Sequence, residues 1–202
     1  MLKTRLAILL SILILMSSGL AMAELAPGTD APAFELTDTE GNEHTLQQYL
    51  DDGKTVVIEW FNPDCPFIKK HHATAHTMDE SFAKVSEHDV IWLAINSSAP
   101  GREGAGLERN QKAHKDYKMS FPILMDPEGT VGRAYGAKTT PHMFVITSDG
   151  KVAYNGAIDD NSSPKKMGET NYVMAALHSV MSDEKIAEAS TRPYGCSVKY
   201  SK

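Results

Sequence analysis

The chain has 202 residues and a formal net charge of −6 at pH 7, with 20 lysines and arginines against 26 aspartates and glutamates. It contains no basic run of the kind that binds nucleic acid or anionic lipid, so we expect neither as a partner. One domain of this length can bury a sufficient core without additional cross-links.

The first residues are typical of a secretory signal peptide. Lys3 and Arg5 precede an apolar run over residues 6–16, and Ala21-Met22-Ala23 provides a small-residue cleavage site. The run is shorter than the roughly 20 residues that span a bilayer. We expect residues 1–23 to be removed and the mature protein to be periplasmic, meeting the membrane only through this segment; an uncleaved anchor is the alternative.

Two apolar runs, residues 55–61 and 90–95, predict strands that are buried on both faces. Between them, residues 68–85 carry an apolar stripe at helical spacing and predict one helix. The stripe consists of Ile68, His71, Ala75, Met78, Phe82 and Val85. Strand, helix and strand in this order predict a right-handed βαβ unit with two parallel strands.

The second half of the chain predicts a polar helix, a β-hairpin and a closing helix. Their order after a βαβ unit is that of a thioredoxin fold, so we expect an α/β protein with a mixed sheet of four to five strands and flanking helices. The expected core is residues 24–160, followed by a closing helix and a tail with Cys196 over residues 161–202. The predicted elements are a helix at 107–117, strands at 143–146 and 152–154 around a turn at 148–150, and a helix at 171–181.

Cys65 lies in a polar turn between the first strand and the helix. Pro66 suits the first helical position, where its missing N–H costs nothing. A sulfur at a helix start faces unpaired N–H groups and the positive end of the helix dipole, which favour a thiolate. Lys69 and Lys70 would act in the same direction. A buried structural cysteine, expected inside a strand or on the apolar stripe, is the alternative. Two exported cysteines also usually form one structural disulfide, so a structural Cys65–Cys196 bond is a second alternative.

These motifs resemble the alkyl hydroperoxide reductase/thiol-specific antioxidant (redoxin) superfamily of thioredoxin-fold proteins. Residues 60–70 resemble a thioredoxin-family active site in which Ile68 replaces the second cysteine of C-x-x-C. The tail, with Gly195-Cys196, resembles the C-terminal motif of a peroxiredoxin-like branch. The resemblance covers nearly the whole mature chain and implies a thiol-dependent oxidoreductase without a cofactor. Its other segments are residues 27–36, 121–126, 134–136 and 140–141.

The resemblance implies that Cys65 acts as a thiolate nucleophile and that Cys196 resolves it through a redox-active disulfide. Ile68 excludes a C-x-x-C dithiol cycle. Asn62 and Ile58 replace the threonine and proline of the usual peroxidatic pattern, so peroxide reduction should be slow. The expected partners are a thiol or disulfide substrate, protein or small molecule, an external electron donor and, in a second interpretation as a slow thiol peroxidase, a hydroperoxide.

Three further residues follow from the same resemblance. Glu59 occupies the position of a buried acid that relays protons in thioredoxins; a solvated strand residue at a sheet edge is the alternative. Thr140-Pro141 resembles the cis-proline that lies opposite the active cysteine. Together with Asn62 and Pro66, this pair is expected to position the substrate.

His71, His72 and His76 suggest a metal site, because His72 and His76 are four residues apart and could share one ion on a helix. A third ligand at close spacing is missing, so we expect no metal. In that interpretation His71 packs on the apolar stripe and the other two are solvated. A redox-inactive or metal-binding protein with a structural Cys65–Cys196 disulfide is the competing function of another class.

Overall fold

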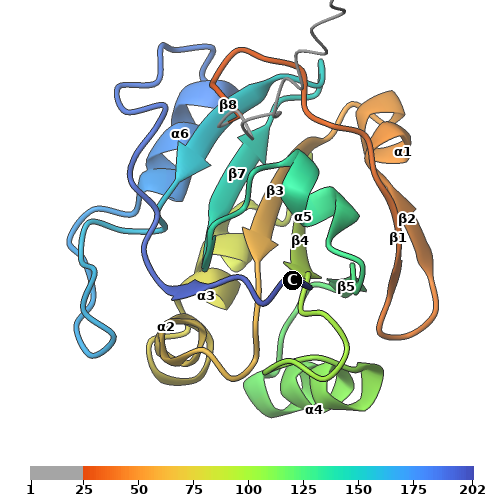
Figure 1. Ribbon diagram of the computed structural model, residues 1–202. Helices are drawn as coiled ribbons and strands as arrows, with labels where there is room; N and C mark the ends of the chain where they lie inside the picture. Colours follow the sequence, from red (N-terminus) through yellow and green to blue (C-terminus); the bar gives the residue numbers. More distant parts are fainter. Residues whose placement is uncertain (1–24) are drawn as a thin grey trace, which may run out of the picture.

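The computed structural model describes residues 25–202 (Figure 1). The predicted signal peptide lies outside these residues. The helices are α1 (Leu46–Asp51), α2 (Pro66–Lys69), the π-helical turn η1 (Lys70–Thr74), α3 (Thr77–Val85), α4 (Leu107–Tyr117), α5 (Thr130–Ala134) and α6 (Tyr172–Met181). The strands are β1 (Glu35–Asp38), β2 (Glu43–Thr45), β3 (Thr55–Trp60), β4 (Val90–Asn96), β5 (Ile123–Met125), β6 (Thr139–Thr140), β7 (Met143–Ile146), β8 (Val152–Gly156) and β9 (Cys196–Ser197).

The main sheet of the described chain has seven strands in the order β2-β1-β5-β4-β3-β7-β8. The interior strand β3 is parallel to β4, as the βαβ unit predicts, and β7 and β8 form the predicted antiparallel hairpin. On its other side β3 pairs antiparallel with β7. The sheet is wider than the expected four to five strands because the β1–β2 hairpin extends it through antiparallel pairing of β1 with β5. The α/β class with flanking helices is as predicted.

Alternate residues of β3 enter two separate cores, because successive side chains of a strand point to opposite faces. Val57 packs in the core beneath α2, α3, α4 and α6, which Cys65 and Phe61 also join. Val56, Ile58 and Trp60 pack on the opposite face with residues of α1 and α5. The turn that carries Cys65 therefore leaves an interior strand of the sheet and enters the helical layer on one defined face.

The helix expected over residues 68–85 is interrupted. The π-helical turn η1 ends at Thr74, and α3 begins at Thr77 after His76, whose φ is 51°. A π-helical turn contains an additional residue, and here two successive side chains, His71 and His72, are both buried. The periodicity is correct on either side of the break, but the sequence does not reveal the break itself.

The other predicted helices have the expected ends. The polar helix coincides with α4 over Leu107–Tyr117. The closing helix α6 starts after Asn171, whose side chain accepts a hydrogen bond from the N–H of Met174 at 3.0 Å and so caps the helix. Within residues 25–202, no helix combines the length and the apolar character that crossing a bilayer requires.

Candidate active site

Cys65 is the residue that precedes the first turn of α2, and Pro66 occupies the first helical position, as predicted. The side chain is 1% exposed and belongs to the core on the helical face of β3. Its Sγ donates a hydrogen bond to the main-chain carbonyl of Thr140 at 3.0 Å. The thiol is therefore buried, although it lies at a helix start rather than inside a strand.

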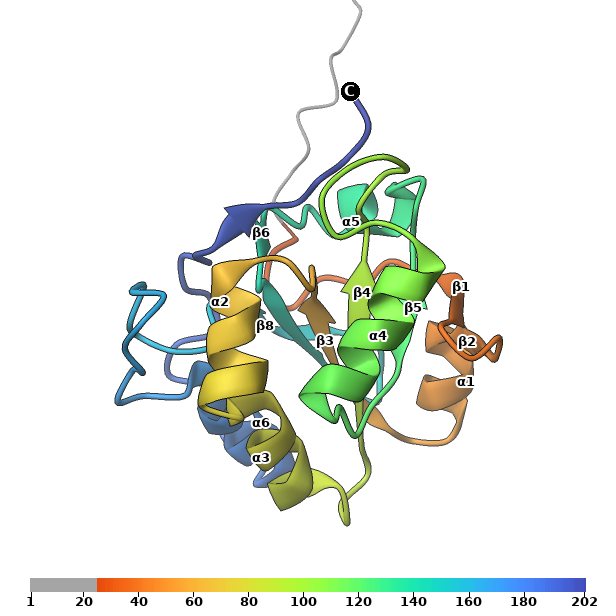
Figure 2. The same cartoon turned by 90° about the horizontal axis from the view of Figure 1, so that it is seen from below.

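The peptide bond between Thr140 and Pro141 is cis, as the resemblance implied. Thr140 belongs to β6, and β6 pairs with β9 of the C-terminal tail in an antiparallel two-stranded sheet. The register sets Thr140 opposite Cys196, so Cys65 and Cys196 both lie against Thr140. Figure 2 shows the blue C-terminal segment running beside β6 at the start of α2.

Gly195 allows the tail to come this close. Its φ is 144°, and a Cβ built at this position would overlap the carbonyl oxygen of Thr140. That oxygen is also the acceptor of the Cys65 thiol. Any larger residue would push the tail away from β6, which gives the Gly195-Cys196 motif a steric explanation.

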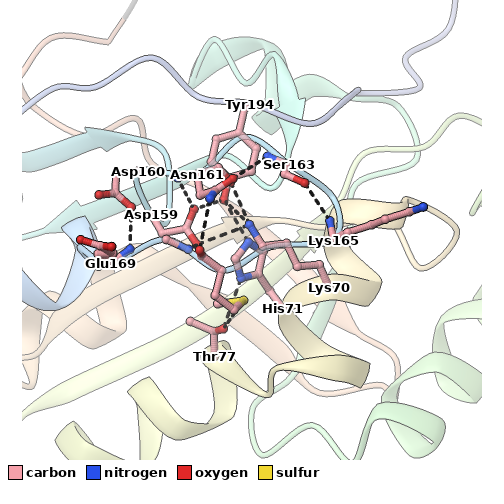
Figure 3. Close-up of polar contacts among 12 residues, drawn as sticks. Lys70, His71, Thr77, Asp159, Asp160, Asn161, Ser163, Lys165, Glu169 and Tyr194 are labelled. Atoms are coloured by element: carbon pink, nitrogen blue, oxygen red, sulfur yellow. Dashed lines mark hydrogen bonds and ion pairs between the residues drawn. The ribbon is translucent and has the colours of Figure 1, made fainter.

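Tyr194 fixes the tail on the other side of Gly195 (Figure 3). Its hydroxyl donates to Asp159, and it lies 3.1 Å from Nε2 of His71 and 3.3 Å from Nζ of Lys70. The ring packs against Phe67 of α2 in a tilted arrangement, with centroids 5.7 Å apart. One tyrosine thereby connects the tail, helix α2 and the loop after β8.

The groups around Tyr194 form a buried polar cluster. Lys70 and Asp159 form an ion pair at 3.4 Å, and both side chains are 3% exposed. Burial would raise the pKa of Asp159, but hydrogen bonds from Tyr194 and from two backbone amides outweigh it and lower the pKa. Burial and the adjacent Lys70 lower the pKa of His71 to about 3, so His71 is neutral. Lys70, which we expected to favour a thiolate at Cys65, is thus paired with Asp159.

Beyond Cys196, a second tyrosine fixes the end of the tail. The hydroxyl of Tyr200 donates to the carbonyl of Ala137 at 2.9 Å, and Arg133 lies over its ring, 4.8 Å from the centroid. A Cβ on Gly132 would overlap the Tyr200 hydroxyl, so α5 is shaped to receive this ring. Cys196 is therefore held between two anchored tyrosines.

Cys196 differs from Cys65 in its surroundings. It is partly exposed, whereas Cys65 is buried. Burial and the contact with the Cys65 side chain raise the pKa of Cys196 to about 12, and the nearby Lys199 offsets this only in part. Cys196 consequently keeps its proton at neutral pH when both cysteines are reduced.

Asn62 is buried and its amide is fully used in holding the turn before Cys65. Its Nδ2 donates to Ser98 Oγ at 3.2 Å and to the carbonyl of Glu103 at 2.9 Å, and its Oδ1 accepts from the N–H of Asp64 at 2.9 Å. These contacts leave the amide engaged with the protein. The side chain at the threonine position of the peroxidatic pattern therefore supports the loop.

Two residues of α4 also hold the turn before Cys65 through hydrogen bonds, and the sequence analysis did not identify them. Arg109 donates to Asp64 at 2.6 Å and to the carbonyl of Pro63 at 3.2 Å, and the hydroxyl of Tyr117 donates to the same carbonyl at 2.8 Å. The signal was present only as a lone arginine and tyrosine on a polar helix. Nothing in their spacing connects them with Cys65.

Glu59 is fully buried on the interior strand β3, so the interpretation as a solvated edge residue was wrong. Both carboxylate oxygens lie 3.0 Å from Nε2 of His72. His72 is also fully buried, contrary to the expectation that it is solvated, and its Nδ1 lies 3.9 Å from Asp79. Glu59 and His72 thus form a buried acid–imidazole pair beneath the active-site helix.

The histidine spacing does not produce a shared face. His72 is paired with Glu59 inside the protein, while His76 is exposed at the break between η1 and α3. In the part of the chain that the structure describes, no group of three or more His, Cys, Asp or Glu side chains could hold a metal ion. The helical i, i+4 argument fails because the helix ends between the two residues.

Comparison with known proteins identifies the family. The model of the AhpC/TSA family matches residues 27–155. The chain belongs to the AhpC/TSA family. The match ends before α6 and the tail, so Cys196 lies outside the part of the chain that the family model describes.

Individual relatives agree with this assignment. The thiol-disulfide oxidoreductase ResA of Geobacillus thermodenitrificans is 31% identical over 128 residues, which are 63% of this chain and 67% of ResA. MT2597 of Mycobacterium tuberculosis, provisionally named a peroxiredoxin, is 25% identical over 68% of this chain and 80% of its own length. These relatives confirm the predicted enzyme class, a thiol-dependent oxidoreductase.

A solved structure extends the similarity to most of the chain. The crystal structure of an uncharacterized conserved protein from Geobacillus kaustophilus matches with a TM-score of 0.79 and 27% identity, covering 88% of this chain and 93% of that one. A DsbE-type thiol:disulfide interchange protein from Chlorobium tepidum has a TM-score of 0.59 and 22% identity and supports the fold alone. The thioredoxin-like fold is thereby confirmed.

Replacing Gly195 by alanine should separate the two cysteines. The added Cβ overlaps the Thr140 carbonyl, and a displacement of about 1 Å between reacting groups costs roughly 10²-fold in rate. We expect Cys65–Cys196 disulfide formation in a mild oxidant to slow by about that factor, measured by acid-quenched alkylation and mass spectrometry. Gly53→Ala is the matched control, because Gly53 also has a positive φ but open space around it. Equal rates in the two variants would contradict the steric explanation.

Replacing Tyr194 by phenylalanine should weaken the buried cluster in a pH-dependent way. Asp159 has a lowered folded-state pKa, so its stabilisation is present above its unfolded pKa of about 3.9 and is lost as the pH falls through the folded pKa. We expect Tyr194→Phe to lower the free energy of unfolding by about 1–3 kcal/mol at pH 7. The difference from the wild type should shrink below pH of about 4 in denaturant titrations. Tyr172→Phe, at the same 590 Å³ cavity, is the control; a pH-independent difference would rule out Asp159 as the cause.

Proposed function

We propose that the protein catalyses thiol–disulfide exchange by cycling between two thiols and a Cys65–Cys196 disulfide. The observation that carries this proposal is the register of β6 with β9, which sets Cys196 opposite Thr140, the residue whose carbonyl accepts the Cys65 thiol. In the half of the cycle that oxidises the protein, the Cys65 thiolate attacks one sulfur of a substrate disulfide and displaces the other sulfur as a thiolate. Cys196 then attacks Cys65 Sγ, the bond from Cys65 to the substrate sulfur breaks, and this second sulfur also leaves as a thiolate.

Thr140 and Pro141 shape the surface on which the exchange takes place, and Pro66 and Asn62 hold the nucleophile. The tail is joined to β6 by strand pairing and to α2 and η1 by Tyr194, without a covalent link in the reduced state. Opening this short pairing would expose both Cys65 and the edge of β6 to a substrate. Residues 24–160 form the catalytic core in this proposal, and residues 161–202 supply the resolving cysteine.

Peroxide reduction is the second candidate, supported by the peroxiredoxin-like relative. A fast peroxidase needs hydrogen-bond donors that align the peroxide with the sulfur. The Asn62 amide, which stands at the position of the usual threonine, donates instead to Ser98 and Glu103. Because the Asn62 amide is already hydrogen-bonded within the protein, we propose disulfide exchange as the main activity and slow peroxide reduction as a side reaction.

We also propose that the protein works after export, in the periplasm. The motivating observations are the basic, apolar and small-residue segments within residues 1–23. Disulfide exchange between two cysteines suits an oxidising compartment. Detection of a mature protein that starts after Ala23, by N-terminal sequencing of a periplasmic extract, would support this localisation, and an intact N-terminus would oppose it.

Glu59 is the proposed proton acceptor of the exchange. Glu59 is fully buried and paired with the His72 imidazole, whose ring packs against Phe61 of the core that Cys65 also joins. A positioned carboxylate can act as a general base toward a thiol. The contact with His72 holds the Glu59 carboxylate in place.

The cysteine variants test the exchange proposal. Oxidised wild-type protein should contain the Cys65–Cys196 disulfide and equilibrate with glutathione redox buffers, whereas Cys65→Ser and Cys196→Ser should each abolish this equilibrium, measured by alkylation and mass spectrometry. A structural disulfide would instead resist reduction to potentials below about −300 mV. As an internal comparison, hydrogen peroxide should oxidise the same protein slowly. Two free thiols under oxidising conditions would contradict the proposal.

Glu59→Gln tests the proton acceptor while preserving a hydrogen-bonding side chain beside His72. We expect the rate of exchange with a model disulfide to fall by about 10²-fold and its pH profile to lose one ionisation. Glu40→Gln, at an exposed turn of the β1–β2 hairpin, is the control. A reduced rate with an unchanged pH profile would assign Glu59 a structural function only.

A further inference from the structure

The tail that brings Cys196 to the site also limits access to Cys65. Cys65 is 1% exposed, and the strand pairing of Cys196 with Thr140 lies directly beside its thiol. Cys196 itself is partly exposed. The two sulfurs therefore differ in a property that decides exchange reactions, which is whether an external nucleophile can reach them.

This difference becomes stricter when the disulfide forms. In the reduced protein the tail over Cys65 is held by hydrogen bonds and packing, which can open and close. In the oxidised protein a covalent bond from Cys196 to Cys65 holds it, and Tyr194 and Tyr200 hold it on either side. The Cys65–Cys196 disulfide, which the donor must reduce, therefore also holds the tail over Cys65.

A thiolate attacks a disulfide along the line of the S–S bond, from the side opposite the leaving sulfur. At Cys65 no open side exists for such an approach, because the residue is enclosed by the core, by Thr140 and by the tail. At Cys196 the approach comes from the partly exposed face of the tail. Lys199 and Glu103, which form an ion pair at 3.4 Å, lie near this face and influence the Cys196 thiol.

We propose that the external thiol that reduces the oxidised protein attacks the sulfur of Cys196, so that the mixed disulfide forms on Cys196 and Cys65 is the leaving group. This inference rests on the proposed exchange function and deepens it by assigning the point of entry of the electron donor. It separates the two halves of the cycle. The substrate is attacked by Cys65 from an opened tail, and the donor enters at Cys196 with the tail closed.

The reaction balances as follows. A donor thiolate forms a bond with Cys196 Sγ; the bond to Cys65 Sγ breaks, and its electron pair leaves on Cys65 as a thiolate. A second donor thiolate then attacks the donor sulfur of the mixed disulfide and releases Cys196, which takes up a proton. Two donor thiols are oxidised to one donor disulfide, and the protein disulfide is reduced to two thiols.

The leaving-group preference points in the same direction. A thiol of lower pKa leaves faster from a disulfide. Burial and the contact with Cys65 raise the pKa of Cys196 to about 12, so Cys196 is a poor leaving group. When Cys65 is the leaving group, the negative charge of the released thiolate is on Cys65 Sγ and not on Cys196 Sγ.

Mapping the mixed disulfide tests the inference. Oxidised full-length protein is mixed with glutathione as the probe, quenched with acid after short intervals and alkylated in denaturant at low pH. Peptide mass spectrometry then locates the glutathione. We expect at least about tenfold more glutathione on Cys196 than on Cys65, with the alkylating label on Cys65. Glutathione predominantly on Cys65 would overturn the inference.

A variant with a loosened tail tests the reason for the preference. Tyr200→Ala removes the anchor on Ala137 and loosens the tail, while both cysteines, Thr140 and Tyr194 are kept. Glutathione on Cys65 should rise several-fold relative to the wild type, and an unchanged ratio would overturn the explanation by access. If no Cys65–Cys196 disulfide is present before glutathione is added, the exchange function itself fails, which is distinguishable from glutathione on the wrong cysteine.

Discussion

Three segments far apart in the sequence meet at the main-chain carbonyl of Thr140. The carbonyl oxygen accepts the hydrogen bond of the Cys65 thiol, and Thr140 itself pairs with Cys196 across the β6–β9 ladder. The absence of a side chain at Gly195 leaves this oxygen free of a clash. Because one carbonyl serves all three segments, a shift of the tail changes the environment of both sulfurs together. The position of the two cysteines, and therefore the chemistry, depends on this single close approach.

The candidate site was predictable where local rules decide it. Cys65 before Pro66 could be identified from its position at a helix start. The Gly195-Cys196 motif was identified only through its resemblance to a family motif, and its steric reason is visible only in the structure. The cluster around Tyr194 could not be identified in the sequence. Its partners come from α2, from η1 and from the loop after β8, and no spacing along the chain connects Lys70 with Asp159. Long-range pairs of this kind become visible only when the fold is known.

The fold, like the site, was predictable where local sequence patterns determine it and not where long-range contacts do. The strands of the βαβ unit and the helices at 107–117 and 172–181 were predictable, since apolar periodicity and a capping residue such as Asn171 act locally. The width of the sheet was underestimated, because β1 and β2 are short and gain their strand character from pairing. The break near His76 was missed because a π-helical turn shifts the register within an apolar pattern that continues on both sides.

The placement of the second cysteine so late in the chain has a consequence for synthesis. Cys65 leaves the ribosome before α4, the β7–β8 hairpin and α6, whereas Cys196 belongs to the last strand. Segments that are synthesised early leave the ribosome before the tail exists. Until Cys196 and Ser197 pair with β6, the tail covers neither Cys65 nor the edge of β6. A product that stops before Tyr194 would lack both the proposed resolving cysteine and the segment that covers Cys65, so a single truncation would remove the two together.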